Sequence, residues 1–161
     1  MEELLVYALL LSENIITEKA YRGKIDKLFE KEPKNELLLE LEWESNIKKA
    51  VMHTIASVEE QGFNEDVFGK LLMEKLKDHY KRAEDIKAFT EEMYRLWRNI
   101  PDSIKHYEPF VELSCLGDPL WWGDEALVHD ICNDTFNYYI ERHNQDNTSI
   151  FMKNFLSRKN K

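Results

Sequence analysis

The sequence has 161 residues, of which 43% are hydrophobic and 33% charged, and its formal net charge is −9. The length and hydrophobic content exclude intrinsic disorder as the main state, and five glycines and four prolines are too few for a fold built on many tight turns. The negative charge disfavours nonspecific binding to nucleic acid, whose phosphates attract cations.

The first predicted helix covers the apolar run 4–11. Glu2 and Glu3 precede it where a secretory signal would carry basic residues, and the run is far shorter than the roughly 20 residues that span a bilayer. We therefore predict a buried helix, no membrane partner and a cytoplasmic location. In that compartment Cys115 and Cys132 are expected to be reduced thiols.

Two amphipathic segments follow. Thr17 can cap a helix that Pro33 ends, and Asn35 can cap a longer helix that ends at Gly62. The second half of this longer helix carries apolar residues at helical spacing, namely Ile47, Val51, Ile55 and Val58.

The middle of the chain predicts two further helices. Phe63 and Phe68 are spaced as a hydrophobic staple around Asn64, which can cap the first of them. The second ends at Pro101 and carries the most regular apolar stripe of the chain: Ile86, Phe89, Met93, Leu96, Trp97 and Ile100. The segment 103–116 is mixed and predicts no clear element.

The last part of the chain predicts a short turn and two helices. Asp118 and Pro119 suit the cap and the first position of the turn. Asp124 can cap a helix that extends to about Arg142, and Asn147 begins a short terminal helix.

These elements predict an all-α fold. Because no repeat, linker or low-complexity tract occurs, we expect residues 1–161 to form a single compact domain, an irregular bundle of roughly six to eight helices. Residues 157–161 are predicted to be a basic, frayed tail.

Acidic residues are concentrated in one part of the chain. Residues 101–146 hold ten acidic and two basic residues, whereas residues 147–161 hold four basic residues and no acidic one. No basic side chain lies between Lys105 and Arg142, so the usual acid–base pairs of a solvated helix, which stabilise it by about 0.2–0.5 kcal/mol each, are missing there. Three interpretations are open: the basic tail folds back onto the acids, or helix-start acids complement a helix dipole, or the acids form a negative surface for a cationic partner.

His129 and Asp130 form a pair within the segment LVHDIC. This segment resembles the core motif of the HD-domain phosphohydrolases, an all-helical family of metalloenzymes, and the resemblance implies that the pair binds a divalent metal that activates water. However, Cys132 stands where the family commonly has Gly, and the distant Asp ligand could only be Asp134, on the same helix, or Asp146. We favour helix packing, with His129 at the edge of a core-facing stripe, and predict neither a metal nor a cofactor.

The strongest candidate for a binding site is the segment CLGDPLWWGDE, residues 115–125. Neighbouring side chains on a helix point in different directions, so we expect one of Trp121 and Trp122 to pack and the other to be at least partly exposed. Packing of both is the alternative, because Trp is usually well buried, whereas an exposed Trp is typical of a binding hot spot. The predicted partner-binding residues are Asp118, Trp121, Trp122, Asp124, Glu125, Asp130 and Asp134.

The features above predict a non-catalytic intracellular protein-binding domain. Its partner would be a basic protein, such as a nuclease toxin neutralised by an immunity-type or charge-mimicking inhibitor, and no nucleic acid. Two alternatives are kept: a metal-dependent phosphohydrolase of HD type that uses His129 and Asp130, and a helical scaffold or oligomerisation domain. The sequence does not determine the oligomeric state.

Overall fold

A computed structural model describes the backbone of residues 1–159 and the side chains of residues 1–142. Over these residues every element of regular secondary structure is a helix, with no strand, and the helices form one compact domain, which confirms the all-α prediction. The elements are α1 (Glu2–Ser12), α2 (Glu18–Lys31), α3 (Glu36–Trp43), α4 (Ile47–Gln61), α5 (Glu65–Tyr80), α6 (Ile86–Asn99), the 3₁₀ helices η1 (Val111–Ser114) and η2 (Asp118–Trp122), and α7 (Glu125–Lys159).

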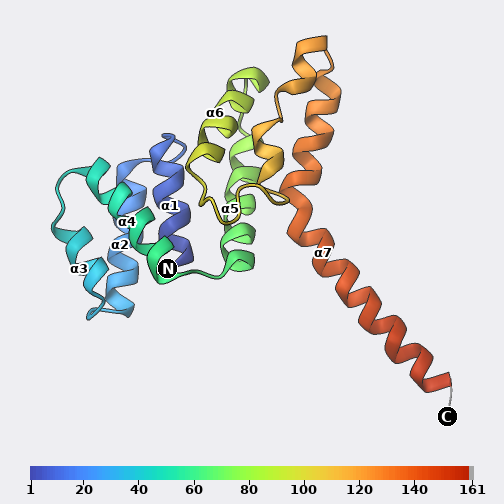
Figure 1. Cartoon of the computed structure of the whole chain (residues 1–161), viewed down its shortest axis with the longest axis horizontal. Helices are drawn as coiled ribbons and strands as arrows, with labels where there is room; N and C mark the ends of the chain where they lie inside the picture. The colour runs from blue at the N-terminus through green and yellow to red at the C-terminus, as the bar shows by residue number, and fades with distance from the viewer. Residues whose placement is uncertain (160–161) are drawn as a thin grey trace.

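Helix α1 lies at the centre of the fold. It contacts α2 and α4 on one side and α5 and α6 on the other (Figure 1). A helix that is apolar on every side is stable only inside a core, and most of α1 is fully buried: Leu4, Leu5, Val6, Ala8, Leu9 and Leu10. The predicted buried first helix is therefore confirmed.

Side-chain caps start several helices at the predicted positions. A backbone amide three residues further on donates to the side chain of each of four caps: Thr17, Asn35, Asn64 and Asp124. The staple at the start of α5 is also present, since the rings of Phe63 and Phe68 lie 5.4 Å apart, nearly edge to face. Short polar residues fix these helix starts because they satisfy backbone donors that have no partner within the helix.

The single helix predicted from Asn35 to Gly62 is wrong, because the chain breaks into α3 and α4 at residues 44–46. Asn46 starts α4: its Oδ1 accepts hydrogen bonds from the backbone amides of Lys48 and Lys49, at 3.1 and 3.2 Å. A side chain that bonds to nearby backbone amides competes with continuation of the preceding helix.

The predicted helix end near Arg142 and the separate terminal helix at Asn147 are also wrong. Helix α7 continues to Lys159 and extends well beyond the other helices (Figure 1). No Gly or Pro occurs between these positions, so the sequence contains no strong signal to end the helix. The predicted frayed tail, 157–161, falls where side chains are not described, and residues 160–161 lie outside the described residues.

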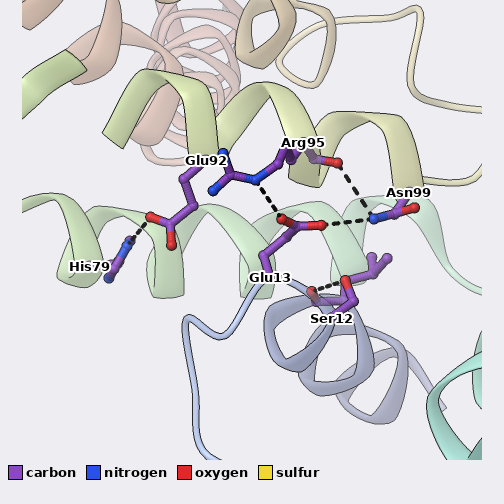
Figure 2. A network of polar contacts seen from close by, with 7 residues as sticks. Ser12, Glu13, His79, Glu92, Arg95 and Asn99 are labelled. Atoms are coloured by element: carbon purple, nitrogen blue, oxygen red, sulfur yellow. Dashed lines mark hydrogen bonds and ion pairs between the residues drawn. The ribbon is translucent and has the colours of Figure 1, made fainter. Parts of the chain in front are cut away.

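Polar contacts hold α6 against its neighbours, as Figure 2 shows. Glu13, just after α1, accepts hydrogen bonds from Arg95 Nε at 3.2 Å and from Asn99 Nδ2 at 3.0 Å. One turn earlier on α6, Glu92 pairs with His79 of α5 at 2.6 Å. These contacts fix the position of the helix that forms one wall of the groove described below.

Candidate protein-binding surface

The two adjacent tryptophans are both exposed. Trp121 is 87% and Trp122 67% exposed, so the expectation that one of them packs is wrong, as is the alternative that both do. Pro119 is buried and Leu120 packs against the core, so these two residues, rather than the tryptophans, anchor the short η2 helix. Gly123, in the left-handed conformation at φ 80°, ends η2 directly after Trp122 and turns the chain into α7.

The other five candidate residues are exposed as well. They are Asp118, Asp124, Glu125, Asp130 and Asp134. We call the corner formed by Asp118, Trp121, Trp122, Asp124 and Glu125 the Trp corner. Asp118 is the first residue of η2 rather than its cap, which is Gly117.

Asp130 and Asp134 do not lie on the same side of α7 as Glu125. At 3.6 residues per turn they are rotated from it by about 140° and 180° around the helix axis. They lie opposite the buried side of this helix, which carries Val128, Cys132, Thr135 and Phe136. The seven candidates therefore form two acidic areas, the Trp corner and the outer face of α7, rather than one flat patch.

Lys105 and Arg142, the basic residues at the two ends of the acidic interval, lie close to acids that are not among the seven candidates. Lys105 pairs with Asp102, and Arg142 Nη1 lies 3.9 Å from Asp66 Oδ1 on α5. Among the side chains of residues 1–142, the only ion pair of the seven candidates joins Glu125 Oε1 to His129 Nε2 at 3.5 Å. The remaining candidate acids therefore have no counter-charge in contact within that part of the chain.

His129 is a boundary residue, as predicted. Its Nδ1 forms a hydrogen bond with the Tyr80 hydroxyl, its Nε2 pairs with Glu125, and its ring lies 5.9 Å from that of Tyr80. Both ring nitrogens thus have protein partners, and Asp130 is exposed. Among the described side chains no group of three or more His, Cys, Asp or Glu residues is placed to hold a metal ion. The geometry therefore gives the HD-type site no support.

The two cysteines are free thiols in environments that disfavour the thiolate. Burial raises the pKa of Cys132 to about 12. The pKa of Cys115 is raised by burial and by the negative charges of Glu112 and Asp118. Because the thiolate is the nucleophilic form, neither residue is activated for covalent catalysis at neutral pH.

A groove of about 710 Å³ beside the Trp corner was not predicted from the sequence. Its charged and aromatic lining comes from α6 and from η2: Lys87, Glu91, Tyr94, Arg95, Asp118 and Trp121. Gly117 lets the two walls approach, because a Cβ atom there would lie 3.0 Å from the hydroxyl oxygen of Thr90. Trp122 is not among the lining residues. The exposed charges of α6 resemble any solvated helix face, so only the fold shows that they face η2.

Comparison with protein-family models, with curated proteins and with solved structures finds no match to this chain. Within the described residues, no helix combines the length and the apolar character needed to cross a membrane.

Proposed function

We propose that this chain is a non-catalytic intracellular protein-binding domain whose partner is a basic protein. The observation that carries the proposal is the Trp corner, where two largely exposed tryptophans stand between Asp118 and Asp124. Exposed aromatic side chains framed by charge are typical of protein interfaces, where Trp is enriched among the residues that dominate affinity.

The tryptophans would supply most of the affinity. An aromatic side chain buries roughly 150–250 Å². At about 25 cal/mol per Å² this corresponds to about 4–6 kcal/mol for each ring, before the costs of association are subtracted. Two such rings at one corner suffice to anchor a complex if the partner offers a complementary pocket.

The acids would supply speed and selectivity. A negative surface attracts a basic protein from a distance and repels acidic ones, so it raises the association rate constant and rejects wrong partners. A protein of this kind can inhibit a nucleic-acid enzyme by covering the basic surface that would otherwise hold phosphates. This is the action of an immunity-type or charge-mimicking inhibitor, and we infer such a role for this chain.

The test starts with the 161-residue chain as bait in native lysate, followed by identification and purification of the protein that it retains. Binding of the purified partner is then measured by calorimetry for the wild type and for the variant Trp121→Ala/Trp122→Ala. We expect the variant to lose at least about 30-fold in affinity, which corresponds to one hot-spot residue of about 2 kcal/mol.

Trp43→Ala is the matched control, because Trp43 is 84% exposed and lies at the end of α3, on the side of the body away from α7 (Figure 1). This variant should bind as the wild type does. Equal affinity of the wild type and a folded Trp121→Ala/Trp122→Ala variant would remove the Trp corner from the binding site.

A further inference from the structure

The groove between α6 and η2 has one exposed aromatic ring on each wall. Tyr94 of α6 is 48% exposed, and Trp121 of η2 projects still further into solvent. Tyr94 is braced from behind, since its ring stacks on that of Trp97 with centroids 5.9 Å apart and planes at 29°. Trp97 is itself fixed by the hydrogen bond from its indole N–H to the carbonyl oxygen of Lys105, at 2.9 Å. The α6 wall therefore presents a preorganised ring face.

Each wall also contributes an acid. Glu91 lies one turn before Tyr94 on α6, and Asp118 begins η2. Neither acid forms an ion pair with a described side chain within 4.0 Å, so both carboxylates are available to a ligand as far as residues 1–142 are concerned.

The two basic residues of the groove differ from each other. Arg95 is compensated, because its Nε atom lies 3.2 Å from Glu13 Oε2, as Figure 2 shows. Lys87 is exposed near the start of α6 and has no ion pair among the described side chains. The charge of Arg95 is cancelled by that of Glu13, so this pair is left out of the charge balance of the groove. The remaining charged groups are two carboxylates and one ammonium group, an excess of negative charge next to two aromatic faces.

We propose that this groove receives an arginine side chain of the partner, with its guanidinium group against Tyr94 and Trp121 and beside Glu91 and Asp118. A guanidinium group is the cation best suited to such a site, because it is planar, stacks on aromatic rings and donates hydrogen bonds to carboxylates in pairs. The inference rests on the proposed function and deepens it: Trp121 contacts an arginine in the groove, whereas Trp122 contacts the partner outside it.

The inference predicts that two charge reversals on α6 change the binding affinity in opposite directions. If an arginine enters the groove, Glu91→Lys weakens binding and Lys87→Glu strengthens it. If the groove instead received an acidic segment, both signs would be reversed. Lys87 and Glu91 lie one turn apart on the same exposed face, so each variant is the other's control for nonspecific effects on α6.

The test uses the 161-residue chain labelled with ¹⁵N at its four tryptophan indoles, each assigned by a Trp→Phe variant. The probe is an end-blocked peptide of alternating arginine and glycine. Peptides with lysine, glutamate or uncharged citrulline in place of arginine are the comparisons. We expect the arginine peptide to shift the Trp121 signal saturably, to bind more tightly than the other three, and to leave the exposed Trp43 unshifted.

The variants are compared with the same peptide after circular dichroism has shown that they are folded. Tyr94→Leu should weaken binding about threefold to fivefold, as loss of one exposed cation–π contact implies. Glu91→Lys should weaken it further, and Lys87→Glu should strengthen it. Equal shifts of Trp43 and Trp121, equal binding of the lysine or citrulline peptide, preference for the glutamate peptide, or variant effects that are absent or of the wrong sign would each overturn the inference.

The purified partner separates this inference from the proposed function. If Trp122→Ala weakens the complex while Tyr94→Leu and Glu91→Lys do not, the chain binds through its Trp corner and the groove inference is wrong. If neither these variants nor Trp121→Ala/Trp122→Ala changes the affinity, the Trp corner is not the binding site and the proposed function fails as well.

Discussion

At the scale of single residues, the clearest constraint is a buried pair of hydroxyl groups. The hydroxyl oxygens of Tyr21 and Thr54 lie 2.8 Å apart, and the Thr54 hydroxyl also lies 2.8 Å from the carbonyl oxygen of Ala50. Since that carbonyl can only accept, Thr54 donates to it and Tyr21 donates to Thr54. Both side chains are fully buried, so neither hydroxyl can bond to water instead.

This direction of donation predicts unequal effects of two conservative changes. Thr54→Val leaves the Tyr21 hydroxyl buried without an acceptor and should lower the free energy of unfolding by about 1–3 kcal/mol. Tyr21→Phe leaves Thr54 bonded to Ala50 and should cost only about 0.5–1.5 kcal/mol. Urea unfolding of both variants measures the difference, and a larger loss for Tyr21→Phe would show that the assignment of donors is wrong.

A second residue-scale prediction concerns alkaline pH. Burial raises the pKa of Tyr139 from its ordinary 10.0 to about 12. Between these values the unfolded chain releases this proton and the folded chain keeps it, so the folded state loses stability as the pH rises through this window. Below it, the residue is protonated in both states and adds no pH dependence.

The variant Tyr139→Phe should therefore show a shallower decline of unfolding free energy above pH 10 than the wild type. Urea unfolding at a series of alkaline pH values provides the measurement. An unchanged slope would mean that Tyr139 ionises equally easily in the folded chain.

Contacts between residues that are close together in the sequence could be predicted from it. The caps at Thr17 and Asn64 could be predicted because a cap and the amides that it binds lie within one turn. The Tyr21–Thr54 pair could not, since it joins α2 to α4 across a long sequence separation. Helical periodicity predicts which side chains are buried only in a helix of several turns. It does not predict that Trp121 and Trp122 are both exposed, because η2 is a single short 3₁₀ helix.

At the scale of elements, α5 and α7 pack closely because α5 carries a glycine at their contact. A Cβ atom at Gly69 would collide with the ring of Tyr139 on α7. Gly69 is thus explained by packing, although glycine disfavours a helix interior.

Gly69→Ala should destabilise the protein by about 1–3 kcal/mol through overpacking, partly offset by the better helix propensity of alanine. Gly23→Ala on α2 is the matched control, because nothing lies within 4 Å of its added Cβ atom. That change should stabilise by about 0.5–1 kcal/mol. Thermal or urea unfolding checks both signs, and stabilisation by Gly69→Ala would contradict the close approach of α5 and α7.

The errors at the scale of elements have a common cause. The segments before and after residues 44–46 both show helical periodicity, so the sequence pattern predicts one continuous helix. The start of a second helix is marked there only by the capping side chain of Asn46. In α7 the reverse occurred, because polar residues at Asn147 indicated a helix start although nothing there ends the preceding helix. Helix content was predictable from the sequence, but boundaries depend on single residues whose alternatives differ little in free energy.

At the scale of the whole molecule, the folded chain combines an uneven charge distribution with an aromatic corner. The sequence showed the acidic interval and the η2–α7 half of the candidate site. It did not show the α6 half, because Glu91 and Tyr94 become neighbours of η2 only when α6 packs against the 3₁₀ segment. The same fold shows that Asp130 and Asp134 are separated from the Trp corner around α7.

The acidic surface makes a prediction about rates. The variant Asp118→Lys/Asp124→Lys/Asp130→Lys/Asp134→Lys should slow association with the basic partner by about ten-fold or more at low salt. The difference should shrink as added salt screens the charges over a Debye length of about 10 Å at 0.1 M. Dissociation should change less, because steering acts before contact.

The association rate constant of this variant, measured by stopped flow with the purified partner at low and high salt, tests the central claim most directly. Its control makes the same change of net charge at exposed acids of α3 and α4: Glu36→Lys, Glu42→Lys, Glu59→Lys and Glu60→Lys. We predict a large, salt-dependent loss of rate for the Asp variant and a much smaller one for the control. Equal losses for the two variants would show that net charge alone matters, and would contradict a binding surface at the Trp corner and the outer face of α7.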